Sequence, residues 1–593
     1  MKSSSKKIKR KDFQPVSDNK GKYHYLIVFL LPLILLSFSL HNGFVYFDDD
    51  ILILDNQAKI SDLSNIGKAF RSDAFLNNSS PYYRPLLNIS LMLDAQVAKA
   101  DPGFYHFMNL VYHCLCCISL LWFFRLLGIK REIALAGAIV FSVHPLMASA
   151  VFWIPARNDL LVTLFGLLFL SLSITFFHNR KPLILLLAIV SFAAAIFSKE
   201  SAVLLPFILA LYLLSTRQYA FDRRKIFLTL GLILVTAVWF ILRMSSIRMV
   251  GAWQLGLWAV VANFSFPLEI IAKFILPFDL AVTPVYSSIY TGLGMLFFIV
   301  ILFSFFIRKE KVVWLFIFGI TWYIAFSLPN MFVRLDTSPS SYDYLVHRAY
   351  FPLVGLLVSI LSLIPGHWVR FNYRPFIVWF SILIVILGGN SVYLGTKYRN
   401  AASFWNSAIA YHPDRAWFHH FLGRYYFKQH DYILFEQQLR KAISLNKHPH
   451  FLYNLGMLYF VEKKSYDSAF LLFNEARATG FTDPEANTNY VKLCLESARA
   501  YFEQGQYKKA VDRCQLAVDL EPENSVAAYN LGLYLIYSGE KKRAATSWRR
   551  SISLDPELKE AYRNLYYYYR NNTTFKDSVE YFAREYRKRG GSI

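Results

Sequence analysis

The sequence is poor in charge and in cysteine. Of its 593 residues only 17% are charged and 55% are hydrophobic, with a mean hydropathy of +0.32. This composition is too apolar for an ordinary water-soluble protein of the same length. The five cysteines show neither metal-ligand spacing nor a disulfide framework. Three of them, Cys114, Cys116 and Cys117, stand in an apolar run, where we expect inert core thiols.

Acidic residues are scarce as well, 40 against 63 lysines and arginines, which gives a net charge of +23. Such a charge can indicate a nucleic-acid partner, but no nucleic-acid-binding motif accompanies it, so none is predicted. Much of the charge lies in short clusters between apolar runs, the pattern that orients a membrane protein. We therefore predict an all-α chain, a polytopic transmembrane helix bundle followed by a soluble domain.

A cleavable signal peptide is also missing. Residues 1–23 carry KKIKRK and no apolar core, and the first apolar run ends in HNGFVYFDDD without small residues at a cleavage site. We expect residues 1–23 to form a cytoplasmic basic tail and the first run to remain as a helix.

Eleven apolar segments approach the roughly 20 residues that a helix needs to cross a bilayer. If the N-terminus is cytoplasmic, the basic clusters after spans two, four, six, eight and ten all fall on the cytoplasmic side. The loops 42–103 and 329–348, and everything after residue 394, then lie outside. As a span, 256–277 would break this alternation, so we interpret it as interfacial or re-entrant. The eleven segments are 24–41, 104–124, 133–150, 158–178, 182–198, 200–215, 226–243, 292–307, 312–328, 349–364 and 376–394.

The C-terminal part repeats with a period near 34 residues. Leu422-Gly423 and Leu455-Gly456 stand 33 apart, and LEP at 520–522 and LDP at 554–556 stand 34 apart. A small residue in the first helix and a proline after the second are typical of tetratricopeptide (TPR) repeats, where each helix pair buries its face against the next. We count about five repeats between 400 and 593, with an insertion near 484–492.

These patterns divide the chain into a membrane domain at 24–396 and an outer TPR domain at 397–593. A TPR array usually offers a groove for a protein or peptide, so we expect such a partner beside the lipid bilayer. A rigid spacer or an oligomerisation arm is the alternative. We find no catalytic constellation in the array, so any chemistry is expected in the membrane domain.

Candidate functional residues begin in the first outer loop. Asp48, Asp49 and Asp50 follow the first span by a few residues, and Arg84 stands in an apolar-aromatic run of the same loop. If the three aspartates stood alone, we would interpret them as a solvated acidic helix end. Polar residues at helical spacing follow in the second span, where they face a bundle interior or cavity, or make helix–helix hydrogen bonds. They are His106, Asn109 and His113.

The outer ends of later spans add further polar residues. Helix capping explains part of the group that follows His144, but not the arginine in it. Lys199 and Glu200 form a turn between two spans, which suits either an intramembrane ion pair or a phosphate-binding lysine. The remaining candidates in these loops are Arg157, Asn158, Asp159, His347, Arg348 and Tyr350.

Carboxylates, cations and histidines are thus predicted to meet at one membrane face. Such a site suits a lipid-linked phosphate donor, because cations hold the phosphate and stabilise the leaving group. A carboxylate can take the proton from an incoming hydroxyl. The apolar bundle would accommodate the lipid tail.

Six segments, in this order, resemble the GT-C integral-membrane glycosyltransferases, most closely the transmembrane-and-tetratricopeptide O-mannosyltransferases and their bacterial relatives. They are YFDDD, YYRPLLNISLMLD, GFYHFMNLVYH, HPLMASAVFWIPARNDLLV, FSKES and HRAYFPLVG. The resemblance covers nearly the whole chain after residue 24, and its specificity lies in the order of the segments together with the TPR array. It implies an inverting transferase that uses a polyprenyl-phosphate sugar at the lumenal or periplasmic face.

By motif position, the resemblance makes Asp49 the expected base, with Asp48 close behind. It assigns the donor phosphate to Arg84, Arg157, Lys199 and Arg348. The acidic pair could bind a divalent metal, but the resemblance requires none, and no metal is predicted. Other site candidates are Asp50, His106, His113, His144, Asp159, Glu200, His347 and Tyr350.

The chain departs from the family pattern at two places. Met147 and Ser149 stand where eukaryotic members usually carry a histidine and a glutamate, and His347 replaces the more usual glutamate before Arg348. These differences weaken the inference that the sugar is mannose and that the carrier is dolichyl phosphate. They leave the expected reaction class unchanged.

The expected function is transfer of mannose or another hexose from a polyprenyl-phosphate donor to a protein hydroxyl. The expected location is a bacterial inner membrane with the active site and TPR domain in the periplasm, or the lumenal side of the ER membrane in a eukaryote. One alternative is a transferase or ligase for a glycolipid or a cell-envelope polysaccharide. The other is a non-enzymatic TPR membrane scaffold or transporter.

Overall fold

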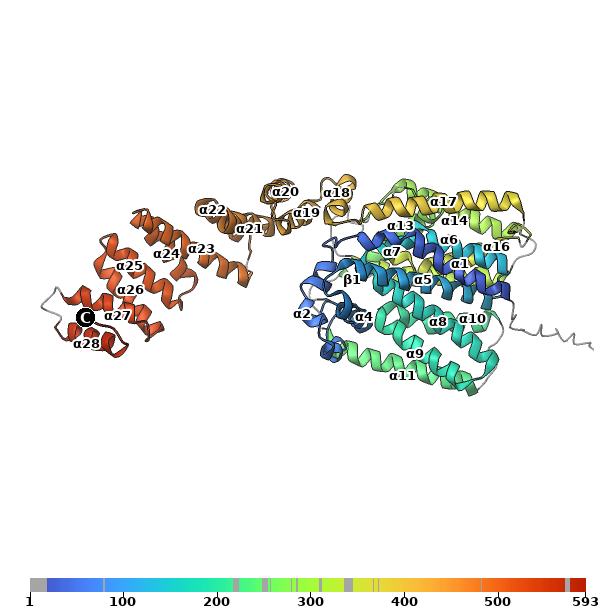
Figure 1. Ribbon diagram of the computed structural model, residues 1–593, viewed down its shortest axis with the longest axis horizontal. Coiled ribbons are helices and arrows are strands. Elements are labelled where there is room, and N and C mark those ends of the chain that lie inside the picture. The colour runs from blue at the N-terminus through green and yellow to red at the C-terminus, as the bar shows by residue number, and fades with distance from the viewer. Residues whose placement is uncertain are drawn as a thin grey trace, which may run out of the picture. The chain divides into compact units, whose positions relative to one another are not determined.

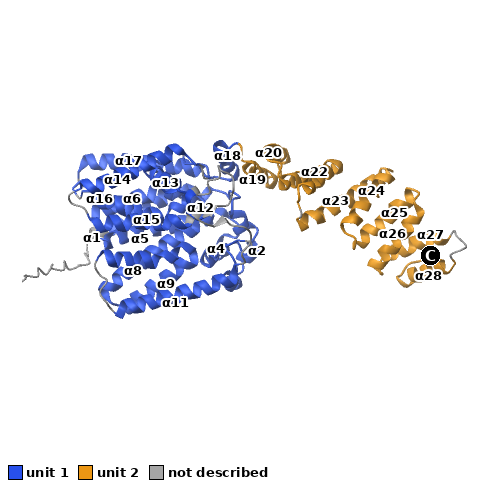
Figure 2. Ribbon diagram, turned by 180° about the vertical axis from the view of Figure 1, so that it is seen from behind, with its two compact units in different colours: residues 1–413 blue, residues 414–593 orange. Residues whose placement is uncertain are grey.

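Two compact units make up the chain, unit 1 (Met1–Pro413) and unit 2 (Asp414–Ile593) (Figure 2). The division falls later than the expected boundary at residue 396, because the helix after the last predicted span packs on unit 1. Most of the predicted basic tail lies outside the described residues. The computed structural model describes residues 19–77, 80–216, 223–247, 254–255, 257–278, 280–283, 286–308, 312–334, 345–365, 367–371, 373–481, 483–570 and 576–593.

The predicted all-α class is confirmed. In the described part of the chain the strands are β1 (Gln254–Leu255) and β2 (Val333–Arg334), which pair antiparallel. All eleven segments expected to span the membrane are helical. Their helices are α1 (Asn19–Leu35), α5 (Pro102–Leu126), α6 (Arg131–Val143) with α7 (Pro145–Phe152), α8 (Arg157–Asn179), α9 (Pro182–Ser198), η5 (Glu200–Leu204) with α10 (Leu205–Ser215), α11 (Arg223–Ser246), α14 (Ser288–Ile307), α15 (Val313–Met331), α16 (Pro352–Leu363) and α17 (Arg374–Thr396).

Six helices of the described chain are long and apolar enough to cross a bilayer, and the pair α6–α7, bent by 48°, would be a seventh. The helices α9, α10, α15 and α16 are apolar but shorter. By length and composition the chain is therefore a multi-pass membrane protein, and the count of eleven spans stays a prediction.

The helix α5 has a central place in unit 1. It packs against α1, α6, α8 and the short helix η1 (Ser37–His41), and α8 packs in turn against α9 (Figure 1). The helices α15 and α16 approach closely through glycines, since a Cβ on Gly319 would lie 2.4 Å from the Gly355 carbonyl oxygen. Side chains such as Ile241, Phe306 and Val385 leave apolar surface exposed on α11, α14 and α17, as contact with lipid requires.

The segment 256–277 forms two short helices, α12 (Leu257–Ala262) and α13 (Ser265–Ile275). Neither is long enough to span a bilayer. In α13, Glu269 and Lys273 form a buried pair with 3.4 Å between the charged atoms. The interfacial or re-entrant placement of this segment stays a prediction.

Short elements of the first outer loop gather at one end of unit 1, where α2, α4 and α18 lie (Figure 1). Two further short helices belong to later outer loops, η4 (Ile154–Ala156) and η6 (Val346–Ala349). The first-loop elements are η2 (Asp50–Leu54), α2 (Gln57–Ile60), η3 (Leu63–Asn65), α3 (Ile66–Ala69) and α4 (Pro85–Ala98), and α18 spans Ala401–Tyr411.

The described residues of unit 2 form five consecutive helix pairs, which confirms the TPR solenoid. In two of the pairs a glycine of the first helix makes room for an aromatic ring of the second, since a Cβ on Gly456 would lie 2.7 Å from Phe473 and one on Gly532 2.4 Å from Trp548. The insertion expected near 484–492 lengthens the start of α23. The pairs are α19 (Ala416–Lys428) with α20 (Tyr432–Leu445), α21 (Pro449–Met457), extended by η7 (Leu458–Glu462), with α22 (Tyr466–Ala478), α23 (Pro484–Glu503) with α24 (Tyr507–Leu520), α25 (Ser525–Tyr537) with α26 (Lys541–Leu554), and α27 (Lys559–Arg570) with α28 (Lys576–Lys588).

Candidate active site

The acidic residues lie on a strained loop, residues 42–49, referred to below as the acid loop. Tyr46 and Asp48 have left-handed backbone, with φ of +55° and +69°. Non-glycine residues adopt this conformation only at a cost in energy, so the surroundings must impose it. The π-helical turn η2 begins directly after the acid loop, and such turns are frequent at functional sites.

Aromatic side chains from two later segments impose the loop's conformation. The indole N–H of Trp153 donates to the Phe47 carbonyl at 2.9 Å, and that of Trp405 donates to the Val45 carbonyl at 3.0 Å. The Phe47 ring stacks on the Trp153 ring, with 5.4 Å between their centres. Because Trp405 belongs to α18, the helix after the last predicted span helps to hold the acid loop.

The carboxylate of Asp49 is turned back onto the acid loop. Its two oxygens accept the backbone N–H groups of Val45 at 2.7 Å and Phe47 at 3.1 Å, and the residue is 2% exposed. Burial raises the pKa of Asp49 to about 7, aided by the neighbouring carboxylates and opposed by the two N–H donors. Asp49 therefore braces the loop.

The carboxylate of Asp48 is half-buried and interacts with charges from distant segments. Burial and the adjacent Asp50 raise the pKa of Asp48 to about 6, while the guanidinium groups of Arg348 and Arg84 act to lower it. At neutral pH this carboxyl group is therefore mostly ionised and within electrostatic reach of two cations.

Arg84 and Glu200 form an ion pair across 116 residues of sequence. The Arg84 Nε lies 3.2 Å from a Glu200 carboxylate oxygen, and the other oxygen accepts the Tyr83 backbone N–H at 2.8 Å. The guanidinium carbon also lies 4.2 Å from the centre of the Tyr82 ring, a cation–π contact. Glu200 thus fixes the segment that precedes α4 and orients its arginine.

Lys199 and His347 meet at Asp159, near the start of α8. The Lys199 Nζ lies 2.6 Å from one carboxylate oxygen, and the His347 Nε2 lies 4.0 Å from the other. Burial lowers the pKa of Lys199, helped by Arg84 and Arg348 and opposed by Asp159. Burial, followed by the charges of Arg348, Lys199 and Arg84, holds the pKa of His347 well below its usual value, so this imidazole is neutral at pH 7.

These contacts bring together residues from four outer segments of the sequence. Lys199 lies within electrostatic reach of Arg84 and Arg348, and these two arginines lie within electrostatic reach of Asp48 in the acid loop. Arg84 and Lys199 each have a carboxylate partner. The residues that the structure gathers in this way are Asp48, Arg84, Asp159, Lys199, Glu200, His347 and Arg348.

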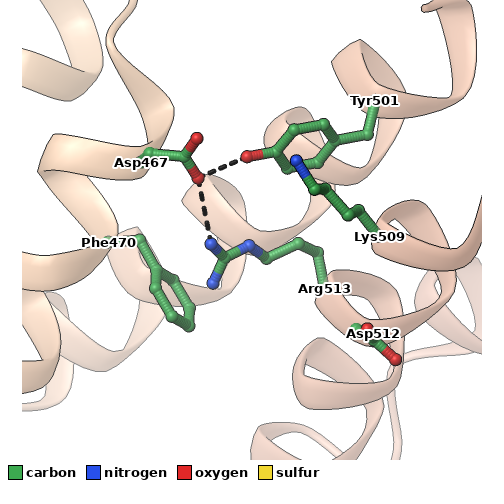
Figure 3. A pocket seen from close by; sticks show the side chains of 6 residues that line it. All are labelled: Asp467, Phe470, Tyr501, Lys509, Asp512 and Arg513. Carbon is green, nitrogen blue, oxygen red and sulfur yellow. Dashed lines mark hydrogen bonds and ion pairs between the residues drawn. The ribbon is translucent and has the colours of Figure 1, made fainter. Parts of the chain in front are cut away.

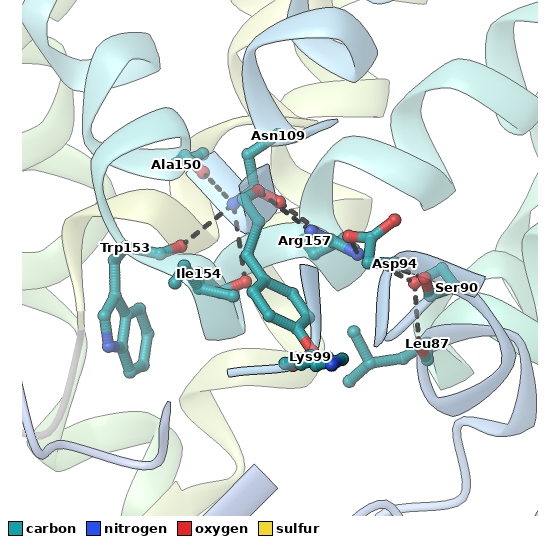
Figure 4. A network of polar contacts seen from close by, with 10 residues as sticks. Leu87, Ser90, Asp94, Lys99, Asn109, Ala150, Trp153, Ile154 and Arg157 are labelled. Carbon is teal, nitrogen blue, oxygen red and sulfur yellow. Dashed lines mark hydrogen bonds and ion pairs between the residues drawn. The ribbon is translucent and has the colours of Figure 1, made fainter. Parts of the chain in front are cut away.

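Arg157 lies elsewhere, in a buried polar network (Figure 4). It is 0% exposed and forms an ion pair with Asp94. Its Nε donates to the Asn109 side chain at 2.7 Å and its Nη2 to the Tyr105 carbonyl at 2.9 Å. With its donors occupied and no exposed surface, Arg157 joins α4, α5 and α8 and is not presented to a donor phosphate. Sequence analysis missed Asp94, although a lone carboxylate in the apolar helix α4 was a usable signal.

The other predicted histidines hold the helices together. His144 accepts the Leu146 backbone N–H at 3.2 Å, as the N-cap of α7, and donates to the Phe274 carbonyl at 2.9 Å. The imidazole of His113 donates to the Ser142 carbonyl at 3.0 Å, and its other nitrogen lies 2.6 Å from the Tyr350 hydroxyl. The remaining candidates, Asp50 and His106, are each 1% exposed.

Unit 2 contains a cavity of about 360 Å³ between α22, α23 and α24 (Figure 3). Arg513 donates to Asp467 at 3.1 Å, and its guanidinium carbon lies 3.2 Å from the centre of the Phe470 ring. The Tyr501 hydroxyl donates to the same carboxylate. These groups satisfy one another, which suits packing between repeats better than catalysis.

Comparison with known families gives two matches. Residues 106–242 match the family described as dolichyl-phosphate-mannose-protein mannosyltransferase, and residues 491–524 match the tetratricopeptide repeat. The predicted resemblance is confirmed over these segments. The first match includes Asp159, Lys199 and Glu200, whereas Asp48, Arg84 and Arg348 lie outside it. The fold brings Arg84 to Glu200 and Arg348 within electrostatic reach of Lys199.

Curated relatives match over short stretches. Protein O-mannosyl-transferase TMTC3 of Mus musculus is 30% identical over 149 residues, which are 24% of this chain and 16% of the relative. Protein O-mannosyl-transferase TMTC1 of Homo sapiens is 35% identical over 97 residues, 16% of this chain and 11% of the relative. The matched part therefore spans about a sixth or less of the length of these relatives.

Two solved structures resemble part of the chain. YrrB, a TPR protein with an unusual peptide-binding site, is 19% identical and covers 32% of this chain and 93% of its own, with a TM-score of 0.25. MamA is 18% identical and covers 28% of this chain and 94% of its own, with a TM-score of 0.22.

Proposed function

We propose that this chain is a membrane glycosyltransferase that moves a hexose from a polyprenyl-phosphate donor to a hydroxyl group of a polypeptide. The observation that carries the proposal is the set of ion pairs at the ends of the apolar helices, Arg84 with Glu200 at 3.2 Å and Lys199 with Asp159 at 2.6 Å. Asp48 lies within electrostatic reach of Arg84 and Arg348. The match to a protein mannosyltransferase family supports the reaction class.

The three cations would hold the phosphate of the donor. Glu200 orients Arg84, and Asp159 fixes Lys199, so both side chains are positioned before the donor binds. Positive groups that are already in place stabilise the charge that develops on the leaving phosphate. The neutral His347 can hydrogen-bond to the sugar or the phosphate without adding a fourth cation.

The reaction is written as one displacement at the anomeric carbon. The acceptor hydroxyl gives its proton to a carboxylate of the acid loop, and its oxygen bonds to the anomeric carbon on the face opposite the phosphate. The bond between that carbon and the phosphate oxygen breaks, which releases polyprenyl phosphate. A single displacement inverts the anomeric configuration. No metal enters this proposal.

Asp48 is the base we propose, with Asp49 as its support. The sequence placed Asp49 first, but both Asp49 oxygens accept backbone N–H groups of their own loop. Asp48 stands beside the two arginines, and with a pKa of about 6 it is ionised and still basic enough to accept a proton at neutral pH.

We place this chemistry on the non-cytosolic side, in the periplasm of a bacterial inner membrane or in the lumen of the ER in a eukaryotic host. The arrangement of basic clusters in the sequence supports that side. The acceptor is proposed to be a polypeptide because unit 2 is a TPR array, a surface that suits a peptide better than a glycan.

The test is a transfer assay with full-length protein in lipid nanodiscs, radiolabelled polyprenyl-phosphate mannose and a serine- and threonine-containing peptide. Asp48→Asn should lower transfer at least about a hundredfold, the usual contribution of a general base. Asp101→Asn is the matched control, because Asp101 caps α5 from an exposed position and asparagine caps equally well. Transfer by Asp48→Asn at the wild-type rate, or label that enters only glycolipid, would overturn the proposal.

A further inference from the structure

The carboxylate of Asp159 holds Lys199 with one oxygen and faces His347 with the other. The Lys199 Nζ lies 2.6 Å from Oδ1, and the His347 Nε2 lies 4.0 Å from Oδ2. Asp159 is 2% exposed, and within the described residues its Oδ2 accepts no hydrogen bond. A buried acceptor without a hydrogen bond is costly, so Asp159 has a position open to one more donor.

His347 can become that donor after a small movement. A hydrogen bond to a carboxylate oxygen spans about 2.8 Å, so a shift of about 1 Å by the imidazole closes the gap to Asp159. The imidazole is neutral at pH 7, and with its hydrogen on Nε2 it donates to the carboxylate. His347 lies in η6, a 3-10 helix of four residues, and so small an element can shift without the rearrangement of a long helix.

The face of the His347 ring leads to the acid loop. This ring packs on the Trp153 ring, with 4.6 Å between their centres. The indole N–H of Trp153 donates to the Phe47 carbonyl at 2.9 Å, and its ring stacks on the Phe47 ring. His347 is 8% exposed and Trp153 6%, so these rings are closely packed and a movement of one displaces the next.

The acid loop can respond to such a displacement. Its left-handed residues Tyr46 and Asp48 keep their conformation only under restraint from outside the loop, and Trp153 supplies one of the restraints. Trp405 supplies another, from α18. A change at Trp153 therefore alters the balance that sets the direction of the Asp48 carboxylate.

A bound phosphate would change what Asp159 holds. An anion that accepts from the Lys199 ammonium competes with Asp159 for it, because both offer charged oxygens at hydrogen-bond distance. The Asp159 carboxylate is too deeply buried to replace Lys199 by water, and His347 is the polar side chain that faces it. The site therefore has two arrangements, Lys199 on Asp159 with His347 apart, and Lys199 on the phosphate with His347 on Asp159.

We infer that His347 is a positioning residue that couples occupation of the phosphate site to the conformation of the acid loop. When a phosphate draws Lys199 from Asp159, His347 moves onto Asp159, and Trp153 and the acid loop move with it. The inference rests on the proposed function in one respect, that the phosphate belongs to the sugar donor. Asp48 then takes its working position only after the donor is bound, so the order of binding is donor first and acceptor second.

The test measures amide hydrogen exchange in the acid loop, separately from transfer. Full-length protein in lipid nanodiscs is mixed with farnesyl phosphate, a short prenyl phosphate, and peptides covering residues 42–49 are analysed by mass spectrometry. The amides of Val45 and Phe47 are bonded to Asp49, so their exchange measures how firmly the loop is held. Farnesyl phosphate should slow this exchange about fivefold, the effect of roughly one hydrogen bond, and farnesol should not.

Two substitutions separate the N–H of His347 from its ring. His347→Gln keeps a side-chain N–H for Asp159 but loses the ring on Trp153, so farnesyl phosphate should bind with wild-type affinity while exchange in the loop no longer responds. His347→Phe keeps the ring and loses the N–H, so Asp159 has no replacement for Lys199. This variant should bind farnesyl phosphate about fivefold more weakly, and its loop should not respond at saturation. Affinity is measured by isothermal titration calorimetry against empty nanodiscs.

The matched control is His367→Phe. His367 is exposed and its ring contacts Trp368, with 6.3 Å between the ring centres, so the substitution repeats the chemical change beside another tryptophan. It should leave affinity and exchange as in the wild type. Superimposable melting curves show that the variants fold. If His347→Phe does not fold, His347→Gln alone decides, because unchanged affinity with a lost response is not what a residue with a purely structural role would give.

Each outcome separates this inference from the proposed function. A wild-type loop whose exchange does not change with bound farnesyl phosphate, or a His347→Gln loop that responds as the wild type does, overturns the inference even if sugar transfer is intact. The expected exchange pattern in a protein without transferase activity supports the coupling and counts against the transferase. Wild-type protein that binds no farnesyl phosphate refutes both.

Discussion

Removal of one partner of the Arg157–Asp94 pair should destabilise unit 1 strongly. Arg157 is 0% exposed and Asp94 3%, so neither charge can turn to solvent when the other is removed. Asp94→Leu leaves a buried guanidinium that still donates to Asn109 and Tyr105 but has no counter-charge. The expected loss is about 3–5 kcal/mol, the usual consequence of an uncompensated buried charge.

Replacement of both partners should cost much less than the sum of the single losses. Arg157→Met alone leaves the Asp94 carboxylate buried without a partner, again at about 3–5 kcal/mol. In the double variant no charge is buried, and the remaining cost is two unpaired acceptors, the Asn109 side-chain oxygen and the Tyr105 carbonyl, at about 1–3 kcal/mol each. The two single losses sum to about 6–10 kcal/mol and the double variant should lose about 2–6 kcal/mol, so the coupling energy should be roughly 4 kcal/mol.

The measurement is unfolding in mixed micelles of dodecyl maltoside and SDS, followed by tryptophan fluorescence, for the wild type, the two single variants and the double variant. Arg440→Met, which removes an exposed ion pair with Glu436 in unit 2, is the control and should change stability by less than about 1 kcal/mol. Additive losses, or a loss below about 1 kcal/mol for Asp94→Leu, would refute the claim that the pair is closed to solvent.

Three further predictions concern the site. Burial and Asp50 raise the pKa of Asp48 to about 6, so transfer should rise with pH up to about 6 and level off above it. Asp50→Asn should move the acidic limb of the kcat/KM profile to lower pH. If the limb does not move, the group that titrates there is not Asp48. Glu200→Gln removes the 3.2 Å partner of Arg84 and should raise the donor KM several-fold with a smaller change in kcat, a split that equal changes would contradict. Trp405→Phe keeps the ring but loses the N–H that donates to the acid loop at 3.0 Å, so kcat should fall about fivefold while donor binding is retained, and an unaltered kcat would show that the loop is held without this bond.

Patterns that depend on local periodicity were predictable from the sequence. Each of the eleven apolar segments is helical, because a helix satisfies the backbone polar groups of an apolar run within the segment itself. The TPR array was equally predictable, since Gly456 and Gly532 recur where a second-helix ring needs room. The boundary between the units could not be predicted from the sequence. The contact of α18 with the acid loop is made by Trp405, one aromatic residue in a chain rich in aromatic residues.

The pairings between distant residues could not be predicted from the sequence. Lys199 and Glu200 are neighbours that suggested an ion pair, yet each has a distant partner, Asp159 for the lysine and Arg84 for the glutamate. Arg157 and Arg348 look alike in sequence, each just before a helix at a predicted outer surface. Only the three-dimensional structure distinguishes the two arginines. Asp94 of α4 forms an ion pair with Arg157, whereas Arg348 lies within electrostatic reach of Asp48.

The position of α18 connects the last predicted span to the chemistry. An acid loop with two left-handed residues cannot hold its own conformation, and its conformation decides that Asp48 stands beside the arginines while Asp49 turns inward. Trp153 restrains one side of this loop, and Trp405 restrains the other from beyond the last predicted span. A chain cut at residue 396 would keep every charged residue of the proposed site and lose the second restraint. The proposed transferase therefore needs the chain at least through α18, and the TPR array begins only after it.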